Sequence, residues 1–320
     1  MSDEQATGAT LVTDLERKPE ALGRLADALA DPAFLEGVPE RPRRIVLTGM
    51  GSSRYAAEVA AQRLRAAGLD AVAELASAAT SWPPGPDVLV LAISATGRSE
   101  ETLTVLERHR GSRIVALTEV PDSPIAAAAD GVVPLHAGPE TSGVACRTFQ
   151  HTLLVLRAIE ARLTGVPHDT PGLVRRVADA SADLLDRRGA WLPEVADALD
   201  APSGVYVLAP AERWSSAAQS ALMVREGPRR PATGCETGDW SHVDVYLTKT
   251  LDYRALLLTG SRWDAQAVDW MRLRGSTFVA VGGPVDGAAV TVRYRGDDDP
   301  AVALATETLI AELVAARWWV

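Results

Sequence analysis

Short apolar runs alternate with segments of helical periodicity along most of the chain. The apolar runs are nearly continuous, as in strands buried on both faces of a parallel sheet, and the segments between them space apolar residues three and four positions apart. Strands are predicted at 43–50, 70–77, 87–94, 113–120, 132–135, 204–210, 253–260 and 276–283. Helices are predicted at 52–68, 99–110, 123–130, 148–163, 215–227, 265–275 and 300–320.

This alternation occurs in two series. An opening segment, 10–31, predicts two helices separated by Pro19, and the Pro- and Gly-containing stretch 165–172 separates the first series of strands and helices from the second. Strand–helix alternation predicts an α/β fold of two tandem flavodoxin-like units, each a parallel sheet with helices on both faces. The expected domains are residues 1–166, which include the opening helices, and residues 167–320.

Length and composition fit a folded protein of two domains. The chain has 320 residues, 47% hydrophobic and 23% charged, and no apolar run reaches about 18 residues, the length that a membrane span needs. The opening MSDEQATGAT is acidic and polar, unlike a secretory signal, so a cytoplasmic location is expected. Cys146 and Cys235 are then expected to be free thiols.

The net charge argues against some partners. At −10, with a pI near 5.1, the chain is poorly suited to bind nucleic acid or an anionic membrane, although a local pocket can still hold a small phosphorylated ligand. Among 32 basic residues only Lys18 and Lys249 are lysines. A reaction through a lysine Schiff base is therefore confined to these two side chains.

Two loops rich in hydroxyl groups follow predicted strands of the first unit. They are GMGSSR at 49–54 and SATGRS at 94–99, with the candidate residues Gly51, Ser52, Ser53, Ser94, Thr96, Gly97 and Ser99. Ligands of open parallel sheets bind outside the carboxyl ends of the strands, where small residues, hydroxyls and a helix N-terminus suit a phosphate. One such loop alone is more often an ordinary helix cap. Two loops on strands expected to be neighbours favour a ligand site.

Other ligand-binding motifs are incomplete. Arg54 stands where a dinucleotide-binding loop has its third glycine, and the sequence contains no P-loop pattern. The sequence has neither a G-x-S-x-G elbow nor a C-x-x-C pair, so neither that type of nucleophilic serine nor a zinc site is expected. We expect no cofactor and no metal.

Three stretches together resemble the SIS (sugar isomerase) family: GMGSS, SATGRSEET and ETSGVACRTF. The similarity extends to the opening helix and to two tandem SIS units, as in the isomerase domain of glucosamine-6-phosphate synthase and the stand-alone deaminases and deglycases of amino-sugar phosphates. In that family the loop hydroxyls hold a sugar phosphate. The resemblance therefore implies this role for the hydroxyls of both loops and places Val144, in the matching Gly-Val-Ala, in the binding site.

The resemblance also implies a catalytic pair in the second unit. Glu226 falls where the family has its catalytic glutamate, and His242, 16 residues later, falls where it has its catalytic histidine. A carboxylate can move a proton between the adjacent carbons C1 and C2, and a histidine can open the sugar ring. Taken singly, Glu226 is typical of a solvated helix end and His242, beside Trp240, of a structural histidine. Together, at the family interval, they favour catalysis.

Several positions depart from the family pattern. In the second loop, Ala95 stands where the family has Gln, and Arg98 stands where it has Glu. Thr148 and Met223 each stand where the family has a lysine, and Val243 stands where it has a glycine. The lysine-bearing C-terminal tail and the glutaminase domain of the synthase have no counterpart in the sequence, so glutamine-dependent synthesis is not expected.

The resemblance implies an enzyme that binds a hexose or amino-sugar 6-phosphate and either interconverts its aldose and ketose forms or releases ammonia from it. A sensor that binds a sugar phosphate without chemistry is the alternative, and the missing lysines favour it. A third interpretation is a step of a specialised pathway on an unusual sugar, which the changed loop positions would suit. Because the family usually builds its site at a dimer interface, a homodimer is expected.

Overall fold

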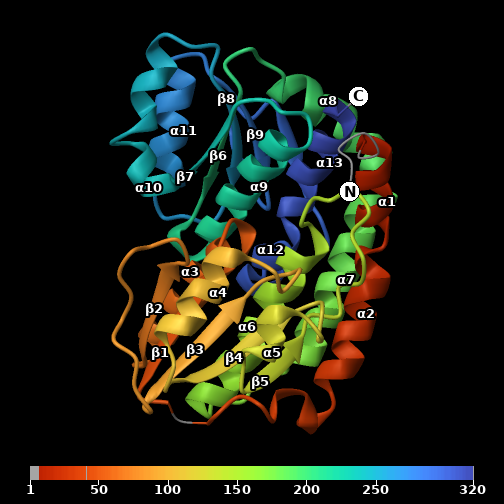
Figure 1. Ribbon diagram of the computed structural model, residues 1–320. Coiled ribbons are helices and arrows are strands. Elements are labelled where there is room, and N and C mark those ends of the chain that lie inside the picture. Colours follow the sequence, from red (N-terminus) through yellow and green to blue (C-terminus); the bar gives the residue numbers. More distant parts are fainter. Residues whose placement is uncertain (1–6, 41, 320) are drawn as a thin grey trace. The chain divides into compact units, whose positions relative to one another are not determined.

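The computed structural model describes residues 7–40 and 42–319, which form two compact units (Figure 1). We call them by their sheets. The first-sheet unit comprises residues 20–40, 42–139 and 147–175, and the second-sheet unit comprises residues 7–19, 140–146 and 176–319. The expected boundary of the sequence domains between residues 166 and 167 stays a prediction.

The first-sheet unit holds five parallel strands in the order β2-β1-β3-β4-β5. The strands are β1 (Arg44–Gly49), β2 (Asp70–Leu75), β3 (Val88–Ile93), β4 (Arg113–Thr118) and β5 (Gly131–Pro134). Its helices are the 3₁₀ helix η2 (Pro32–Leu35), α3 (Ser52–Ala66), α4 (Glu100–Arg108), α5 (Pro124–Ala127) and α6 (Arg147–Thr164). Two further helices, α2 (Lys18–Leu29) and α7 (Thr170–Asp186), contribute residues to both units.

Both faces of the first sheet are covered, as nearly continuous apolar strands require. Side chains that alternate along the strands, such as Val46 and Val90, pack with Leu106 of α4 and Ile125 of α5. The opposite set of strand side chains is also buried, and α3 packs against β1, β2 and α6. Burial on both faces explains why these strands show no alternation of polar and apolar residues.

The second-sheet unit repeats this topology in the order β10-β9-β8-β6-β7. Its strands are β6 (Val205–Ala209), β7 (Ala232–Glu236), β8 (Arg254–Leu258), β9 (Thr277–Val281) and β10 (Val290–Val292). Its helices are α1 (Gly8–Glu16), α8 (Arg188–Leu199), α9 (Trp214–Glu226), α10 (Thr237–Trp240), α11 (Asp264–Leu273), α12 (Pro300–Thr306) and α13 (Thr308–Trp318), with the 3₁₀ helices η3 (Ala211–Arg213) and η4 (Asp244–Lys249).

Two parallel five-stranded sheets with flanking helices confirm the predicted α/β fold and its repeated architecture. The strand β7, with the sequence ATGCE, and the three-residue edge strand β10 were not predicted, because neither contains the continuous apolar run of a central strand. The predicted C-terminal helix is divided between α12 and α13 at Glu307, which is buried and pairs with Arg213 at 3.0 Å. In the described ranges, no helix is both long and apolar enough to cross a membrane.

Candidate functional site

The two hydroxyl loops follow neighbouring strands. β1 pairs in parallel with β3, and Thr48 lies opposite Ala92 close to the carboxyl ends of both strands. Gly49 ends β1, and a Cβ at this position would lie 2.7 Å from the Cβ of Ser53 and 2.9 Å from the carbonyl oxygen of Ile93. Only glycine permits this approach, which brings the start of the first loop against the end of β3. The expectation that the two loop-bearing strands are neighbours is confirmed.

The second loop is held in a defined turn against the start of α5. Gly97 has a φ of +64°, and a Cβ there would collide with the Ser123 hydroxyl at 1.9 Å. The Gly97 amide donates to the carbonyl of Ser94 at 3.1 Å, and its carbonyl accepts from the amide of Ile125 at 3.0 Å. Gly97 thus supplies a backbone conformation that other residues adopt only with strain.

The hydroxyls of these loops are engaged to different degrees. Ser94 is buried, Ser52 and Ser53 are half-buried and Thr96 is exposed, and within the described part of the chain none of these four hydroxyls has a hydrogen-bond partner. Ser99 is different, because its Oγ accepts from the Thr102 amide at 3.3 Å and donates to Glu101 at 2.8 Å. Ser99 therefore serves as the N-cap of α4, whereas the other four are available to a ligand.

Helix N-termini and charge make this end of the sheet suitable for an anion. No side chain caps the N-terminus of α3, and its N-cap residue is Gly51. The partial positive charge of a helix N-terminus favours a phosphate, and the exposed Arg98 adds a full positive charge in the second loop. The other loop arginine, Arg54, pairs with Glu58 at 2.7 Å.

The equivalent loop of the second sheet is already filled by a carboxylate of the chain. After β8, Oδ2 of Asp264 accepts from the amides of Gly260 at 2.7 Å and Ser261 at 3.1 Å. Before α9, Arg213 makes the buried ion pair with Glu307. These two amides and this guanidinium therefore already have internal partners, unlike the four loop hydroxyls of the first sheet.

Glu226 is the last residue of α9 and remains accessible to solvent. Surrounding protein atoms still remove part of its hydration, which raises the pKa of its carboxyl above the ordinary value, while Arg225 lowers it and limits the shift. A carboxylate in such a setting can accept a proton from carbon more readily than a fully hydrated one. The geometry is compatible with the predicted base, and its role stays a prediction.

His242 is exposed and follows α10, with its amide donating to the carbonyl of Asp239 at 2.8 Å. Its position is fixed by buried neighbours. Trp240 donates its indole N–H to the Tyr253 hydroxyl at 2.7 Å. Burial raises the pKa of the Asp244 carboxyl and raises that of the Cys235 thiol to about 12. The exposed imidazole thus lies between two buried residues, Trp240 and Asp244.

The two lysines differ in their availability. Lys18 is fully buried and its Nζ lies 2.8 Å from the Glu312 carboxylate. Lys249 is exposed, with Nζ 5.3 Å from the ring centre of Tyr246. Lys18 is therefore committed to an internal ion pair. Both cysteines are buried free thiols, as expected.

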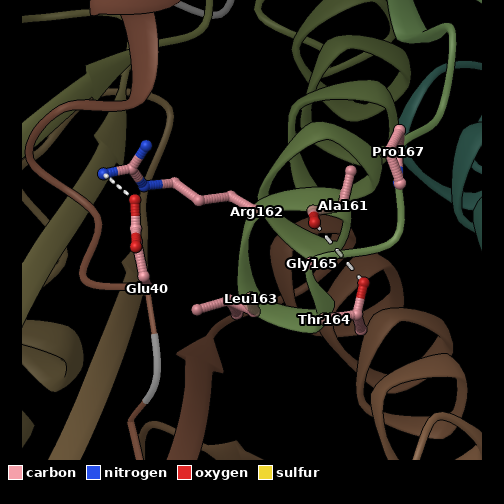
Figure 2. Close-up of a pocket in the computed structure, with 7 residues that line it drawn as sticks. All are labelled: Glu40, Ala161, Arg162, Leu163, Thr164, Gly165 and Pro167. Atoms are coloured by element: carbon pink, nitrogen blue, oxygen red, sulfur yellow. Dashed lines mark hydrogen bonds and ion pairs between the residues drawn. The ribbon is translucent and has the colours of Figure 1, made fainter.

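A pocket of about 380 Å³ lies elsewhere in the first-sheet unit (Figure 2). Glu40, which precedes β1, faces Arg162 near the end of α6, with 3.9 Å between their charged groups. The hydroxyl loops follow the carboxyl ends of β1 and β3, so this pocket lies at the opposite, amino end of the strands. None of its lining residues is a predicted site residue, and it is not the candidate site.

Comparison with known proteins bears on these observations. Residues 40–161, which include both hydroxyl loops, match the family model of the SIS domain. This stretch is a SIS domain. The SIS domain accounts for the first sheet and its loops, and the resemblance seen in the sequence is confirmed.

The similarity to curated relatives and to solved structures extends beyond this stretch of the chain. The chain is 28% identical over 255 residues to a glutamine–fructose-6-phosphate aminotransferase [isomerizing] of Aeropyrum pernix, covering 75% of this chain but only 41% of that protein. Tagatose-6-phosphate ketose/aldose isomerase of Escherichia coli has a similar fold, with a TM-score of 0.77 at 16% identity over 96% of this chain and 91% of the isomerase. Glucosamine-6-phosphate deaminase of Thermotoga maritima has a TM-score of 0.73 at 16% identity, over 97% and 93%.

The predicted site residues fall into two groups. The first-sheet unit carries Gly51, Ser52, Ser53, Ser94, Thr96, Gly97 and Ser99, and the second-sheet unit carries Val144, Glu226 and His242. Val144 was predicted with the first domain, yet it packs against Met223 and Val224 of α9. No metal-binding group of three or more His, Cys, Asp or Glu side chains is found among residues 7–40 and 42–319.

Proposed function

We propose that this protein is an enzyme acting on a hexose or amino-sugar 6-phosphate by proton transfer between C1 and C2. The observation that carries the proposal is the pair of loops at the carboxyl ends of β1 and β3, with unpartnered hydroxyls and an uncapped helix N-terminus. That chemistry suits a phosphate dianion. The similarity to sugar-phosphate isomerases and a deaminase supports the same substrate class.

In this proposal, Ser53, Ser94 and Thr96 donate hydrogen bonds to the phosphate, and His242 assists ring opening by moving a proton between the ring oxygen and the O1 hydroxyl. Glu226 removes the proton from one of the carbons C1 and C2 and returns it to the other. A second proton passes between O1 and the hydroxyl or amine on C2. With a hydroxyl at C2 the two transfers interconvert aldose and ketose. With an amine at C2 the aldose becomes a 2-imino sugar, and water then converts the imine to a ketone and releases ammonia.

A sensor that binds sugar phosphates without turnover is the second candidate. The positions where the family has lysines carry Met223 and Thr148, both buried, and Lys18 is locked in its ion pair with Glu312. These observations leave Lys249 as the one exposed lysine side chain of the chain, and they do not affect the proposed phosphate site. A panel of sugar phosphates tested by thermal shift, followed by assays for ketose and ammonia, separates the candidates, since a sensor is stabilised by ligand and forms no product.

The decisive variant is Glu226→Gln, which keeps the shape of the side chain and removes its basicity. We expect sugar-phosphate affinity within about twofold of wild type and turnover reduced by at least about a thousandfold, because the proton then has no acceptor. Titration calorimetry and a coupled product assay measure the two effects. Glu212→Gln, in η3, is a control for removal of one acidic group. Normal turnover in Glu226→Gln would reject the assigned base.

A further inference from the structure

The segment 140–146, which we call the strap, belongs to a different unit from the residues on either side of it. Its neighbours in sequence, up to 139 and from 147, lie in the first-sheet unit, whereas the strap itself packs within the second-sheet unit. It carries Val144, for which the resemblance implies a contact to the ligand. The contacts that hold the strap therefore decide where Val144 lies relative to the rest of its unit.

Helix α1 holds the N-terminal half of the strap. Asp14 is fully buried, and its Oδ2 accepts from the Ser142 amide at 2.8 Å, while its Oδ1 accepts from the Thr141 hydroxyl at 3.4 Å. A buried carboxylate that accepts a backbone N–H makes a charge-assisted bond, stronger than one between neutral groups. Asp14 thus fixes the backbone two residues before Val144.

Helix α9 holds the C-terminal half. Gln219, also fully buried, donates from Nε2 to the carbonyl of Ala145 at 2.8 Å. Gln219 and Glu226 lie seven residues apart, which is about two turns of the same helix. Between them, Met223 packs against Val144 in one buried cluster. The strap is therefore attached directly to the helix that ends in the predicted base.

The end of the strap is closed by two further contacts. The Cys146 amide donates to the Glu140 carboxylate at 2.8 Å, which joins the first and last residues of the strap. The Cys146 carbonyl accepts from Lys18 at 3.3 Å, and Lys18 is itself paired with Glu312 of α13. Hydrogen bonds thus reach the strap backbone on both sides of Val144.

We propose that Asp14 and Gln219 are positioning residues that lock Val144 to the helix carrying Glu226. This inference rests on the proposed function and on the resemblance to the SIS family, which implies that Val144 lies in the sugar-phosphate site. Catalysis by proton transfer depends on the substrate carbon being held within a fraction of an ångström of its productive place, so a strap free to shift loses both binding and rate. Neither residue touches the substrate, and both act through the strap backbone.

The test compares four variants of the full chain. Asp14→Leu removes the hydrogen bonds from Thr141 and Ser142, and Gln219→Leu removes the hydrogen bond to Ala145. Asp14→Asn keeps a carbonyl oxygen that can accept from the Ser142 amide. Glu16→Leu, on the same helix α1, breaks the 2.5 Å ion pair with Arg188 of α8 and leaves the strap untouched. Hydrogen exchange of peptides covering the strap, sugar-phosphate affinity and inorganic-phosphate affinity are measured for each variant.

We expect Asp14→Leu and Gln219→Leu to accelerate exchange in the strap and to weaken sugar-phosphate binding by about tenfold, as loss of one well-made contact does. Their affinity for inorganic phosphate stays at the wild-type value, because the proposed phosphate donors are in the first-sheet loops. General destabilisation would not separate the two ligands. Asp14→Asn and Glu16→Leu keep wild-type affinity for both.

Three results overturn the inference. The first is wild-type sugar-phosphate affinity in both leucine variants, and the second is an equal loss of affinity for the sugar phosphate and for inorganic phosphate. The third is rapid exchange of the strap amides in the wild-type protein. If Asp14→Leu does not fold, Gln219→Leu makes the same test from α9. Results from the variants test the strap inference alone. If the wild-type protein binds no sugar phosphate, the proposed function is overturned as well.

Discussion

Ser94 and Ser99 lie in the same loop, but their hydroxyls have different tasks. Ser94 is a buried residue whose hydroxyl has no partner among the described residues, whereas Ser99 caps α4 through the Thr102 amide. Sequence alone cannot separate a ligand-binding serine from a capping serine, because both stand just before a helix. The hydrogen bonds of the folded chain make the distinction.

Substitution of these two serines by alanine should therefore affect different quantities, ligand binding for Ser94 and folding stability for Ser99. Ser94→Ala should weaken sugar-phosphate binding by about tenfold with little change in unfolding free energy, since its hydroxyl makes no internal bond. Ser99→Ala should lower the unfolding free energy by about 1 kcal/mol through loss of the N-cap. Titration calorimetry and urea denaturation measure the two quantities. Similar loss of stability in both variants would contradict the distinction.

His109 gives the first-sheet unit a dependence on pH. The side chain is fully buried, with Nε2 2.8 Å from the Ser81 hydroxyl and Nδ1 3.4 Å from the Ser112 hydroxyl. Burial lowers the pKa of His109, opposed by Glu74 and assisted by Arg108. The folded protein therefore favours the neutral imidazole, and the unfolded chain binds the proton more readily.

The contribution of His109 to the unfolding free energy is therefore complete above the pKa of the unfolded chain, about 6.5. This contribution is lost as the pH falls towards the lowered pKa of His109 in the folded protein. Wild type should become less stable between about pH 7 and pH 5, and His109→Gln should show a smaller loss over the same range. Urea denaturation at a series of pH values provides the measurement. An identical slope for both proteins would mean that other groups cause the loss.

At the scale of elements, an internal ion pair joins the start of α2 to α13. Lys18 and Glu312 are both fully buried, and burial raises the pKa of Glu312 while Lys18 opposes the shift. Buried ion pairs are expensive to break, because the remaining charge is left without a partner, but they are often cheap to replace as a pair.

Lys18→Met alone should reduce the unfolding free energy by about 3 to 5 kcal/mol, whereas Lys18→Met combined with Glu312→Leu should recover most of that loss. The double variant also removes a possible amine nucleophile, so turnover that survives in it would exclude Lys18 from the chemistry. Chemical denaturation of the two variants gives the comparison. A double variant as unstable as Lys18→Met would show that the methionine packs poorly.

The elements show where periodicity predicts structure and where it does not. Strands buried on both faces, such as β1 and β3, were predicted because their apolar runs are unbroken. The strand β7 was missed, since Thr233, Gly234 and Glu236 interrupt its pattern and only its place beside β6 makes it a strand. The neighbouring hydroxyl loops were predicted from the general topology of parallel sheets, and the strand order confirms that neighbourhood.

At the scale of the whole molecule, the resemblance to SIS proteins predicts a homodimer. Sedimentation equilibrium should give twice the chain mass of 33.9 kDa at micromolar concentration. Mixing Glu226→Gln with His242→Ala tests whether a site draws on two copies, because each mixed dimer would then regain one intact site. A monomer at concentrations that support full turnover would contradict this prediction.

Periodicity, turn residues and hydroxyl-rich loops are local properties, so the amino-acid order was enough to predict two α/β units, two hydroxyl loops after the neighbouring strands β1 and β3, and the helix that ends in Glu226. Only the tertiary structure shows that the strap belongs to the second-sheet unit. Asp14 lies 128 residues from Ser142, and Gln219 lies 74 residues from Ala145. No local pattern marks such partners, because their hydrogen bonds form only where packing brings distant segments together and excludes water.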